Sequence, residues 1–170
     1  ELGHKLVKRI LDVTEAVELM DIGEVGAEDW GAVVSAIGAP NAIREIGIYY
    51  SPTRAFKLLE QILPEGILEK KFSYTLSGEI GTASIFSAML TAVLKKISIV
   101  DCDGAGRAVP ELEMSTYASN DIPVSPSTVA SEKYEEVKAA FYGKTPSDMD
   151  QLLRATISTS KFGEIAGLAT

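Results

Sequence analysis

The segment from Trp30 to Ile37 is a nearly continuous apolar run, Trp-Gly-Ala-Val-Val-Ser-Ala-Ile, which stops at Gly38-Ala39-Pro40. A strand with one wet face alternates apolar and polar residues, whereas a strand covered on both faces is apolar throughout. The run therefore predicts a strand inside a sheet that has helices on both sides. Shorter segments predict three further strands, at 17–21, 72–76 and 97–100.

Helical patterns fall between these predicted strands. Leu6, Val7, Ile10 and Leu11 share one face of a helix near the start of the chain. Ser51-Pro52 opens a second helix, with the serine as the expected N-cap and the proline as the first helical residue. A third helix, made of small and apolar residues, is predicted from 82 to 94.

The rest of the chain gives weaker signals. The helix that begins at Ser51 should end at Pro64 and Gly66, and we expect helices at 132–142 and 148–157 and a last strand at 165–169. Strands that alternate with helices predict an α/β fold. Its expected form is a three-layer sandwich with a parallel or mixed sheet flanked by helices. A length of 170 residues is that of one domain.

The charge of the chain excludes two classes of partner. Its formal net charge is -8, and nucleic-acid binding depends on neutralising phosphates. We therefore expect no nucleic-acid partner and no anionic membrane, and no apolar run reaches the roughly 18 residues that span a bilayer. Cys102 is the single cysteine, so no internal disulfide forms and a reducing, cytoplasmic compartment is expected.

The densest group of polar residues follows the predicted strand at 97–100. It reads Asp-Cys-Asp-Gly-Ala-Gly-Arg-Ala-Val-Pro-Glu-Leu-Glu from Asp101 to Glu113. In open α/β folds, ligands bind beyond the carboxyl ends of the strands. If the strands are parallel, their turns gather Glu79, Asp101 and Asp103 at one edge, where Arg107 offers a planar fork to a carboxylate or a flat polar ring.

The segment from Asp101 to Glu113 has other interpretations. A turn capped by its own aspartates is the structural alternative. A calcium loop is excluded, because the fifth and twelfth positions counted from Asp101 are Ala105 and Leu112. A magnesium-dependent phosphatase of the haloacid dehalogenase type also carries Asp-x-Asp-Gly after a buried strand. It stays a weaker alternative, since Ala105 stands where threonine or valine usually follows.

Five short motifs together resemble a known family. In chain order they are Ile37-Gly38-Ala39-Pro40, Arg44-Glu45, Arg54-Ala55-Phe56, Gly78-Glu79-Ile80-Gly81 and the string from Asp101 to Thr116. Their order and spacing resemble the amino-terminal domain of the S-methyl thiohydantoin desulfurase family, which is associated with hydantoinases and oxoprolinases. The resemblance covers residues 17–131. It implies that 1–170 is one α/β domain, the amino-terminal domain of a longer member whose β-rich second domain is not present.

The resemblance implies a hydrolase domain that acts on a hydantoin-like or thiohydantoin-like cyclic amide, with its active site between Asp101 and Glu113. The expected partners are this small molecule and, in a homo-oligomer, further copies of the chain. A divalent metal, magnesium or manganese, is the candidate cofactor at Asp101 and Asp103. The alternative is a non-catalytic ligand-binding or assembly domain of a multi-domain or multi-subunit enzyme.

The candidate site residues follow from the strand-end turns and the matched motifs. The candidate catalytic residues are Glu79, Asp101, Asp103, Arg107 and Glu111. The candidate ligand-binding residues are Gly38, Ala39, Pro40, Glu45, Gly104, Gly106 and Glu113.

Overall fold

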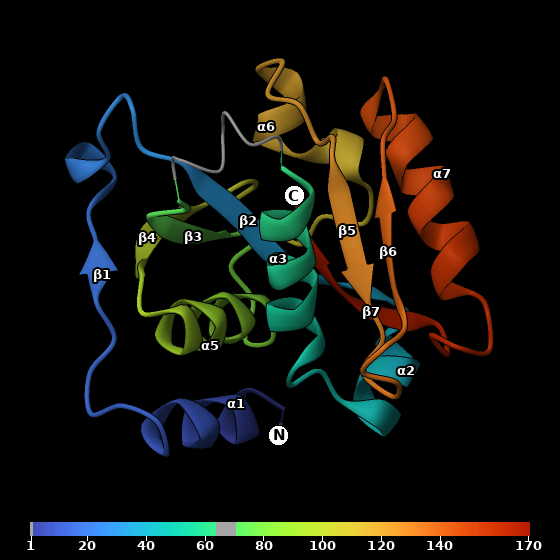
Figure 1. Cartoon of the computed structure of the whole chain (residues 1–170), viewed down its shortest axis with the longest axis horizontal. Helices are drawn as coiled ribbons and strands as arrows, with labels where there is room; N and C mark the ends of the chain where they lie inside the picture. Colours follow the sequence, from blue (N-terminus) through green and yellow to red (C-terminus); the bar gives the residue numbers. More distant parts are fainter. Residues whose placement is uncertain (1, 64–70) are drawn as a thin grey trace.

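The computed structural model describes residues 2–63 and 71–170. Within these residues, seven strands form one sheet in the order β1-β4-β3-β2-β7-β5-β6 (Figure 1). The strands are β1 (Leu19–Met20), β2 (Gly31–Gly38), β3 (Tyr74–Ser77), β4 (Ser98–Asp103), β5 (Ser127–Ala130), β6 (Lys138–Phe141) and β7 (Ile165–Ala169).

The sheet has a parallel half and an antiparallel half. β1, β4, β3 and β2 pair in parallel, whereas β2, β7, β5 and β6 pair antiparallel. This confirms the predicted mixed sheet. β2 is the strand at which the direction of pairing changes, because its two neighbours run opposite to one another.

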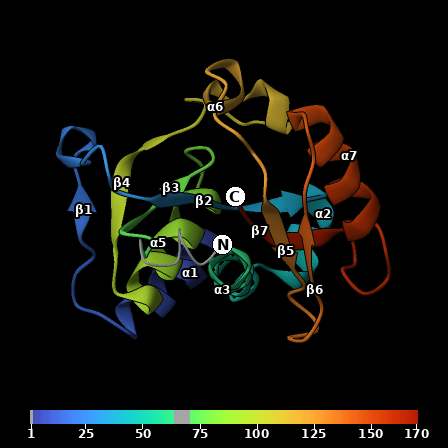
Figure 2. The same ribbon diagram turned by 45° about the horizontal axis from the view of Figure 1, so that its top comes forward.

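Helices cover both faces of the sheet. The described helices are α1 (Leu2–Leu11), α2 (Pro40–Ile46), α3 (Ser51–Ile62), α5 (Ser84–Lys95), α6 (Thr116–Ser119) and α7 (Pro146–Ile157), with 3-10 turns η1 (Ile22–Glu24) and η2 (Leu112–Met114). Figure 2 shows α3 and α5 below the sheet and α6 and α7 above it. The three-layer α/β sandwich is therefore confirmed.

The packing around β2 explains its apolar sequence. Ala32 and Val34 are buried in the core between the sheet and helices α3 and α5. Ile37, on the opposite face, packs against the cluster that contains Leu153 and Ile157 of α7. Both faces of the strand are covered, as the run of apolar residues predicts.

Small side chains allow α5 to lie close to the sheet. Ala88 and Thr91 are fully buried. The hydroxyl of Thr75 in β3 donates a hydrogen bond to the carbonyl of Ala88 (3.2 Å), and the hydroxyls of Thr53 and Thr91 lie 2.9 Å apart. The buried helix of small residues predicted at 82–94 is therefore confirmed, two residues shorter at its start.

Ser51 is not the N-cap of α3, which corrects the sequence-based prediction. The N-cap is Tyr50, and the Ser51 hydroxyl is buried without a hydrogen-bond partner. The carboxylate of Glu132 instead accepts hydrogen bonds from the backbone N–H groups of Tyr49 (3.1 Å), Tyr50 (3.1 Å) and Ser51 (2.9 Å). A helix N-terminus attracts negative charge, so a carboxylate from a distant segment replaces the local cap.

The prediction of a helix at 132–142 is wrong. The Glu132 carboxylate caps the N-terminus of α3. The chain then continues into β6, which pairs with β5. The sequence-based analysis did not predict β5. Val137, Ala139 and Phe141 pack against the cluster beneath α7. Their spacing of two residues is that of a strand, and tertiary pairing overrides the local helical preference.

The strand predicted at 97–100 continues to Asp103. Thr75 of β3 faces Ile99 and Ser77 faces Asp103, so a step of two residues along β3 matches a step of four along β4. Such a bulge bends a strand and re-aims its side chains. Asp101 and Cys102 therefore belong to a bulged strand and not to a loop.

Two further expectations concern the end of α3 and membrane-spanning helices. α3 ends at Ile62, and Pro64 and Gly66 lie outside the described residues. None of the helices described in 2–63 and 71–170 is both long enough and apolar enough to cross a membrane.

The contact between β7 and α3 requires a glycine. A Cβ on Gly167 would lie 2.0 Å from the carbonyl carbon of Ser51 and 2.1 Å from the nitrogen of Pro52. Both atoms belong to the backbone, so neither can rotate away.

We predict that Gly167→Ala lowers the free energy of unfolding by about 3 kcal/mol, because the extra methyl forces α3 away from the sheet. Urea denaturation followed by circular dichroism measures the change. Gly81→Ala is the matched control, since its Cβ would have only the Glu79 carboxylate as a neighbour, at 3.8 Å. An equal loss in both variants would contradict the prediction.

Candidate functional site

A long segment crosses the face of the sheet between β4 and β5. We call residues 104–117 the strap; it includes η2 and enters α6. Its base is closed by Thr116, whose backbone N–H and hydroxyl both donate to the carbonyl of Gly104, at 2.7 and 2.8 Å. The strap contains most of the polar segment from Asp101 to Glu113. Hydrogen bonds to neighbouring carboxylates hold it in place.

Asp103 fixes the start of the strap. Its carboxylate accepts the backbone N–H of Gly106 (2.9 Å) and the backbone N–H of Ile80 (2.9 Å) in the turn after β3. The turns that follow β3 and β4 are therefore bonded together. This agrees with the expectation that parallel strands bring Glu79 and Asp103 into one neighbourhood.

Glu79 holds the middle of the strap. One carboxylate oxygen accepts the backbone N–H of Val109 at 2.6 Å, and the other accepts the hydroxyl of Ser84 at 3.1 Å. Ser84 is the first residue of α5. Both oxygens of Glu79 are thus engaged by the protein, and the residue links β3, the strap and α5.

Asp150 and Arg154 of α7 hold the far end of the strap. Asp150 pairs with Arg154 and accepts the backbone N–H of Leu112 at 3.4 Å, while Arg154 donates to the carbonyl of Pro110. The hydrogen bond with Asp150 raises the pKa of Arg154, with a further contribution from the negative charge of Glu111. The guanidinium therefore remains charged and neutralises part of this acidic corner.

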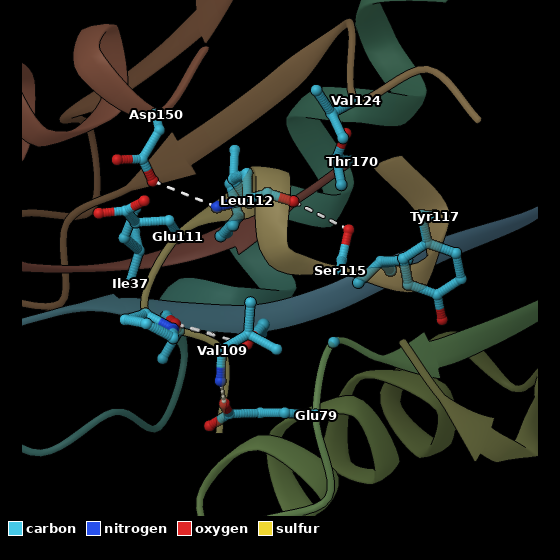
Figure 3. A pocket seen from close by; sticks show the side chains of 16 residues that line it. Ile37, Glu79, Val109, Glu111, Leu112, Ser115, Tyr117, Val124, Asp150 and Thr170 are labelled. Carbon is cyan, nitrogen blue, oxygen red and sulfur yellow. Dashed lines mark hydrogen bonds between the residues drawn. The ribbon is translucent and has the colours of Figure 1, made fainter. Parts of the chain in front are cut away.

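Beneath the strap lies a pocket of about 110 Å³, which we call the smaller pocket (Figure 3). Its floor is formed by Val33, Ser35 and Ile37 of β2. Its polar lining groups come from both halves of the sheet and from the strap: Ser35, Glu79, Glu111, Ser115, Tyr117, Asp150 and Thr170. In the view of Figure 3, Glu111 and Asp150 lie at one end of the pocket and Tyr117 at the other.

Glu111 differs from the other two carboxylates of the smaller pocket. Glu79 and Asp150 are held by backbone N–H groups. Within the described part of the chain no hydrogen bond engages the Glu111 carboxylate, whose negative charge acts on Arg154. Glu111 is therefore the lining carboxylate that is available to accept a hydrogen bond or a proton from a ligand.

A second pocket, the larger pocket, lies on the same face of the sheet over β3 and β4 and has a volume of about 780 Å³. Its walls are mostly apolar and include Trp30, Leu76, Val100 and Ile122. Cys102 also lines it. Burial raises the pKa of the Cys102 thiol, and the charges of Asp103 and Asp101 raise it further.

Tyr117 lines both pockets. Its hydroxyl is buried and has no hydrogen-bond partner among the residues that the structure describes. Burial raises the pKa of Tyr117 far above its usual range, with smaller contributions from Cys102, Asp103 and Tyr74. The phenol is therefore neutral and keeps its proton to donate.

The structure brings together only some of the predicted site residues. Glu79 and Glu111 line the smaller pocket, whereas Asp101, Asp103 and Arg107 line neither pocket. Asp101 and Arg107 are exposed. The Asp103 carboxylate accepts the backbone N–H of Ile80 in the turn after β3. The predicted ligand-binding residues also lie outside both linings: Gly38, Ala39, Pro40, Glu45, Gly104, Gly106 and Glu113.

Sequence-based reasoning did not select Tyr117, Asp150 or Ser115 as site residues. Asp150 and Arg154 stand four residues apart in a predicted helix, a spacing that favours an ion pair. That spacing could have indicated the pair but not its contact with the strap, 38 to 44 residues earlier in the chain.

The candidate metal site is not completed by the fold. Among residues 2–63 and 71–170 no group of three or more histidine, cysteine, aspartate or glutamate side chains could hold a metal ion. Asp101 and Asp103 therefore find no third ligand of these types, and Glu111 does not join them. Magnesium is often held by only one or two carboxylates, with water among its six oxygen ligands, so a metal at Asp101 and Asp103 stays a prediction.

Comparison with known proteins gives a family and a fold. The family model described as "S-Me-THD-like, N-terminal domain" matches residues 1–139. A crystal structure of a protein from Chromobacterium violaceum, a structural genomics target, superposes with a TM-score of 0.84 at 26% sequence identity. The match covers 99% of this chain and 47% of that one, so this chain spans about half the length of its structural relative. No curated protein matches.

We predict that alkylation of Cys102 by iodoacetamide has its pH midpoint higher in the folded protein than in the urea-unfolded chain. Burial and the two aspartates disfavour the thiolate in the folded state, so the folded pKa is raised. The Cys102 thiol therefore stabilises the folded state at low pH, and this stabilisation is lost as the pH rises through the folded pKa of the thiol. The rate of alkylation against pH in both states checks this.

Asp101→Asn should lower the folded midpoint, because it removes one of the two charges that oppose ionisation. Asp101 is exposed, so the substitution leaves the core intact. Glu113→Gln is the matched control, since Glu113 is exposed and does not act on Cys102. A midpoint in the folded protein equal to that in urea would refute the effect of burial.

Proposed function

The chain belongs to the S-Me-THD-like N-terminal domain family, and on this basis we propose that its smaller pocket binds a hydantoin-like or thiohydantoin-like cyclic amide on which the domain acts as a hydrolase. The observation that carries the proposal is the Glu111 carboxylate. It lines a pocket sized for one small ring, and the other lining carboxylates are already occupied by the protein.

The chemistry of the pocket suits such a ring. Cavities of about 150 Å³ hold a benzene molecule, so a pocket of about 110 Å³ accommodates a single five-membered ring. A cyclic amide presents N–H donors and carbonyl or thiocarbonyl acceptors. Glu111 accepts an N–H, and the neutral Tyr117 hydroxyl is a donor for the acceptor groups. The hydroxyls of Ser35 and Ser115 already donate to the carbonyls of Ala36 and Leu112.

The proposed reaction is hydrolysis at a ring carbon that carries an S-methyl group and a C=N bond. Glu111 takes a proton from water as general base, and the water oxygen forms a bond to that carbon. The carbon–sulfur bond then breaks, and the sulfur leaves as methanethiol with the proton returned through Glu111. The other water proton passes to the ring nitrogen, so the ring product carries a carbonyl and an N–H.

The remaining carboxylates are positioning groups in this proposal. Glu79, Asp150 and Arg154 hold the strap at Val109, Leu112 and Pro110. Glu111 stands between these anchored residues. The strap therefore cannot shift Glu111 without breaking one of these hydrogen bonds, and a fixed carboxylate avoids the loss of orientation that weakens general-base catalysis.

A second candidate function is a ligand-binding domain without catalysis, which serves a larger enzyme. It is favoured by the structural use of Glu79, Asp103 and Asp150, since three carboxylates of the region are engaged with backbone groups. In that case Glu111 recognises a ring N–H and transfers no proton. Tight binding without turnover separates this candidate from the hydrolase.

The pocket linings do not support the phosphatase alternative. Asp101 and Asp103, which would be its nucleophile and its general acid, line neither pocket. The smaller pocket is lined by Glu79, Glu111 and Asp150, and these negative charges repel a phosphomonoester.

Glu111→Gln is predicted to lower kcat for an S-methylated thiohydantoin by about 100-fold or more, because the amide cannot accept the proton of water. Release of methanethiol, measured with a thiol-reactive dye, gives the rate. The melting temperature should stay unchanged, since the Glu111 carboxylate makes no hydrogen bond within the described residues.

Glu113→Gln, two positions further along the strap, is the matched control and should retain full turnover. Full turnover in Glu111→Gln would overturn its role as base. Binding of the ring by the unsubstituted protein with no methanethiol released, at any pH from 6 to 9, would favour the non-catalytic candidate.

A further inference from the structure

The smaller and larger pockets adjoin one another. Four residues line both: Val33, Tyr117, Val124 and Thr170. Val33 and Thr170 exchange two backbone hydrogen bonds, at 2.9 and 3.1 Å, and form the floor where the pockets meet. Tyr117 and Val124 come from the strap and from the segment that follows α6. Figure 3 shows Tyr117, Val124 and Thr170 at the end of the smaller pocket away from Glu111.

The two pockets differ in size and in chemistry. The smaller pocket, of about 110 Å³, carries the carboxylates. The larger pocket, of about 780 Å³, is walled mainly by apolar side chains, and the described residues that line it include no carboxylate. That volume lies in the range of roughly 300–1,000 Å³ that is usual for small-molecule sites. A single five-membered ring leaves this apolar volume unused.

Tyr117 marks the boundary between the two environments. Gly104 allows its ring to lie against the end of β4, because a Cβ on Gly104 would lie 2.3 Å from the Tyr117 Cε2 atom. The hydroxyl is buried and unpartnered. A buried hydroxyl without a partner is unfavourable, and an acceptor atom on a ligand at this boundary satisfies it.

We propose that the two pockets form one composite site for a cyclic amide that carries a bulky apolar substituent. The polar ring lies in the smaller pocket, the substituent extends over Val33 and Thr170 into the larger pocket, and the Tyr117 hydroxyl donates a hydrogen bond to a carbonyl or thiocarbonyl of the ring. This inference rests on the proposed function and adds the substrate class, namely rings derived from amino acids with large apolar side chains.

The first test compares two ligands that differ only in the substituent, hydantoin and 5-benzylhydantoin. Isothermal titration calorimetry on the full chain measures both affinities. We expect 5-benzylhydantoin to bind at least about tenfold more tightly, because the benzyl group leaves water for the apolar pocket. Equal affinities would overturn the composite site and leave the proposed function standing, whereas no binding of either ring would refute both.

Cys102 gives an independent readout of where the substituent lies. It lines the larger pocket and not the smaller one, and it is the single cysteine of the chain. Saturating 5-benzylhydantoin should slow alkylation of Cys102 by at least about tenfold, while saturating hydantoin should leave the rate unchanged. Tighter binding of the benzyl compound without protection of Cys102 would overturn the placement of the substituent.

A reversible block of the larger pocket completes the test without a substitution. Benzyl methanethiosulfonate places a benzyl disulfide on Cys102 and displaces sulfinate. The blocked protein should bind hydantoin normally and lose the tenfold advantage of 5-benzylhydantoin, and reduction with dithiothreitol should restore that advantage. An advantage that survives the block would count against the composite site.

The role of Tyr117 is tested by Tyr117→Phe. We expect about threefold to tenfold weaker binding of both ligands, with no fall in melting temperature, because the hydroxyl has no partner in the free protein. Tyr142→Phe, at an exposed position, is the matched control and should bind both ligands as the unsubstituted protein does. Unchanged affinity in Tyr117→Phe would remove the proposed hydrogen bond.

Discussion

The pairing of β2 is the constraint on which the rest of the structure depends. One edge bonds in parallel to β3 and the other bonds antiparallel to β7, while Ala32 and Val34 fill the core on one face. The parallel half supplies the turns with Glu79 and Asp103, and the chain that leads into β7 contributes α7, with Asp150 and Arg154. The candidate site exists only where these two halves meet, above β2.

The strap converts this junction into a site. Its backbone N–H groups at Gly106, Val109 and Leu112 are bound by Asp103, Glu79 and Asp150. A carboxylate that accepts backbone N–H groups is an anchor, and a carboxylate left over is available for chemistry. This distinction separates Glu111 from its neighbours, although all four look alike in a list of acidic residues. Of the acidic residues between 101 and 113, Asp103 is used in the folding of the strap and Glu111 in the proposed function.

Much of the architecture could be predicted because it follows from local patterns. The apolar run at 30–37 indicated the doubly covered β2, and the small residues of 82–94 indicated the buried α5. The neighbourhood of Glu79 and Asp103 followed from parallel strands ending at one edge. Features that join distant segments could not be predicted in this way. Glu132 caps α3 from more than 80 residues away, and β6 is a strand because β5 is available to pair with it.

The sequence by itself determined the α/β class, the family and the region of the chain in which the candidate site lies, whereas the choice between a parallel and a mixed sheet came from the structure. Each of these follows from the order of residues along the chain. Only the tertiary structure decided which residues of that region face the pockets, because hydrogen-bond partners and close packing depend on segments brought together in space. Asp101 lies in the bulged part of β4 and lines neither pocket, and Gly104 leaves room for the ring of Tyr117 at the boundary between the pockets. Neither arrangement is encoded in a local pattern, since each depends on the position of a neighbouring segment.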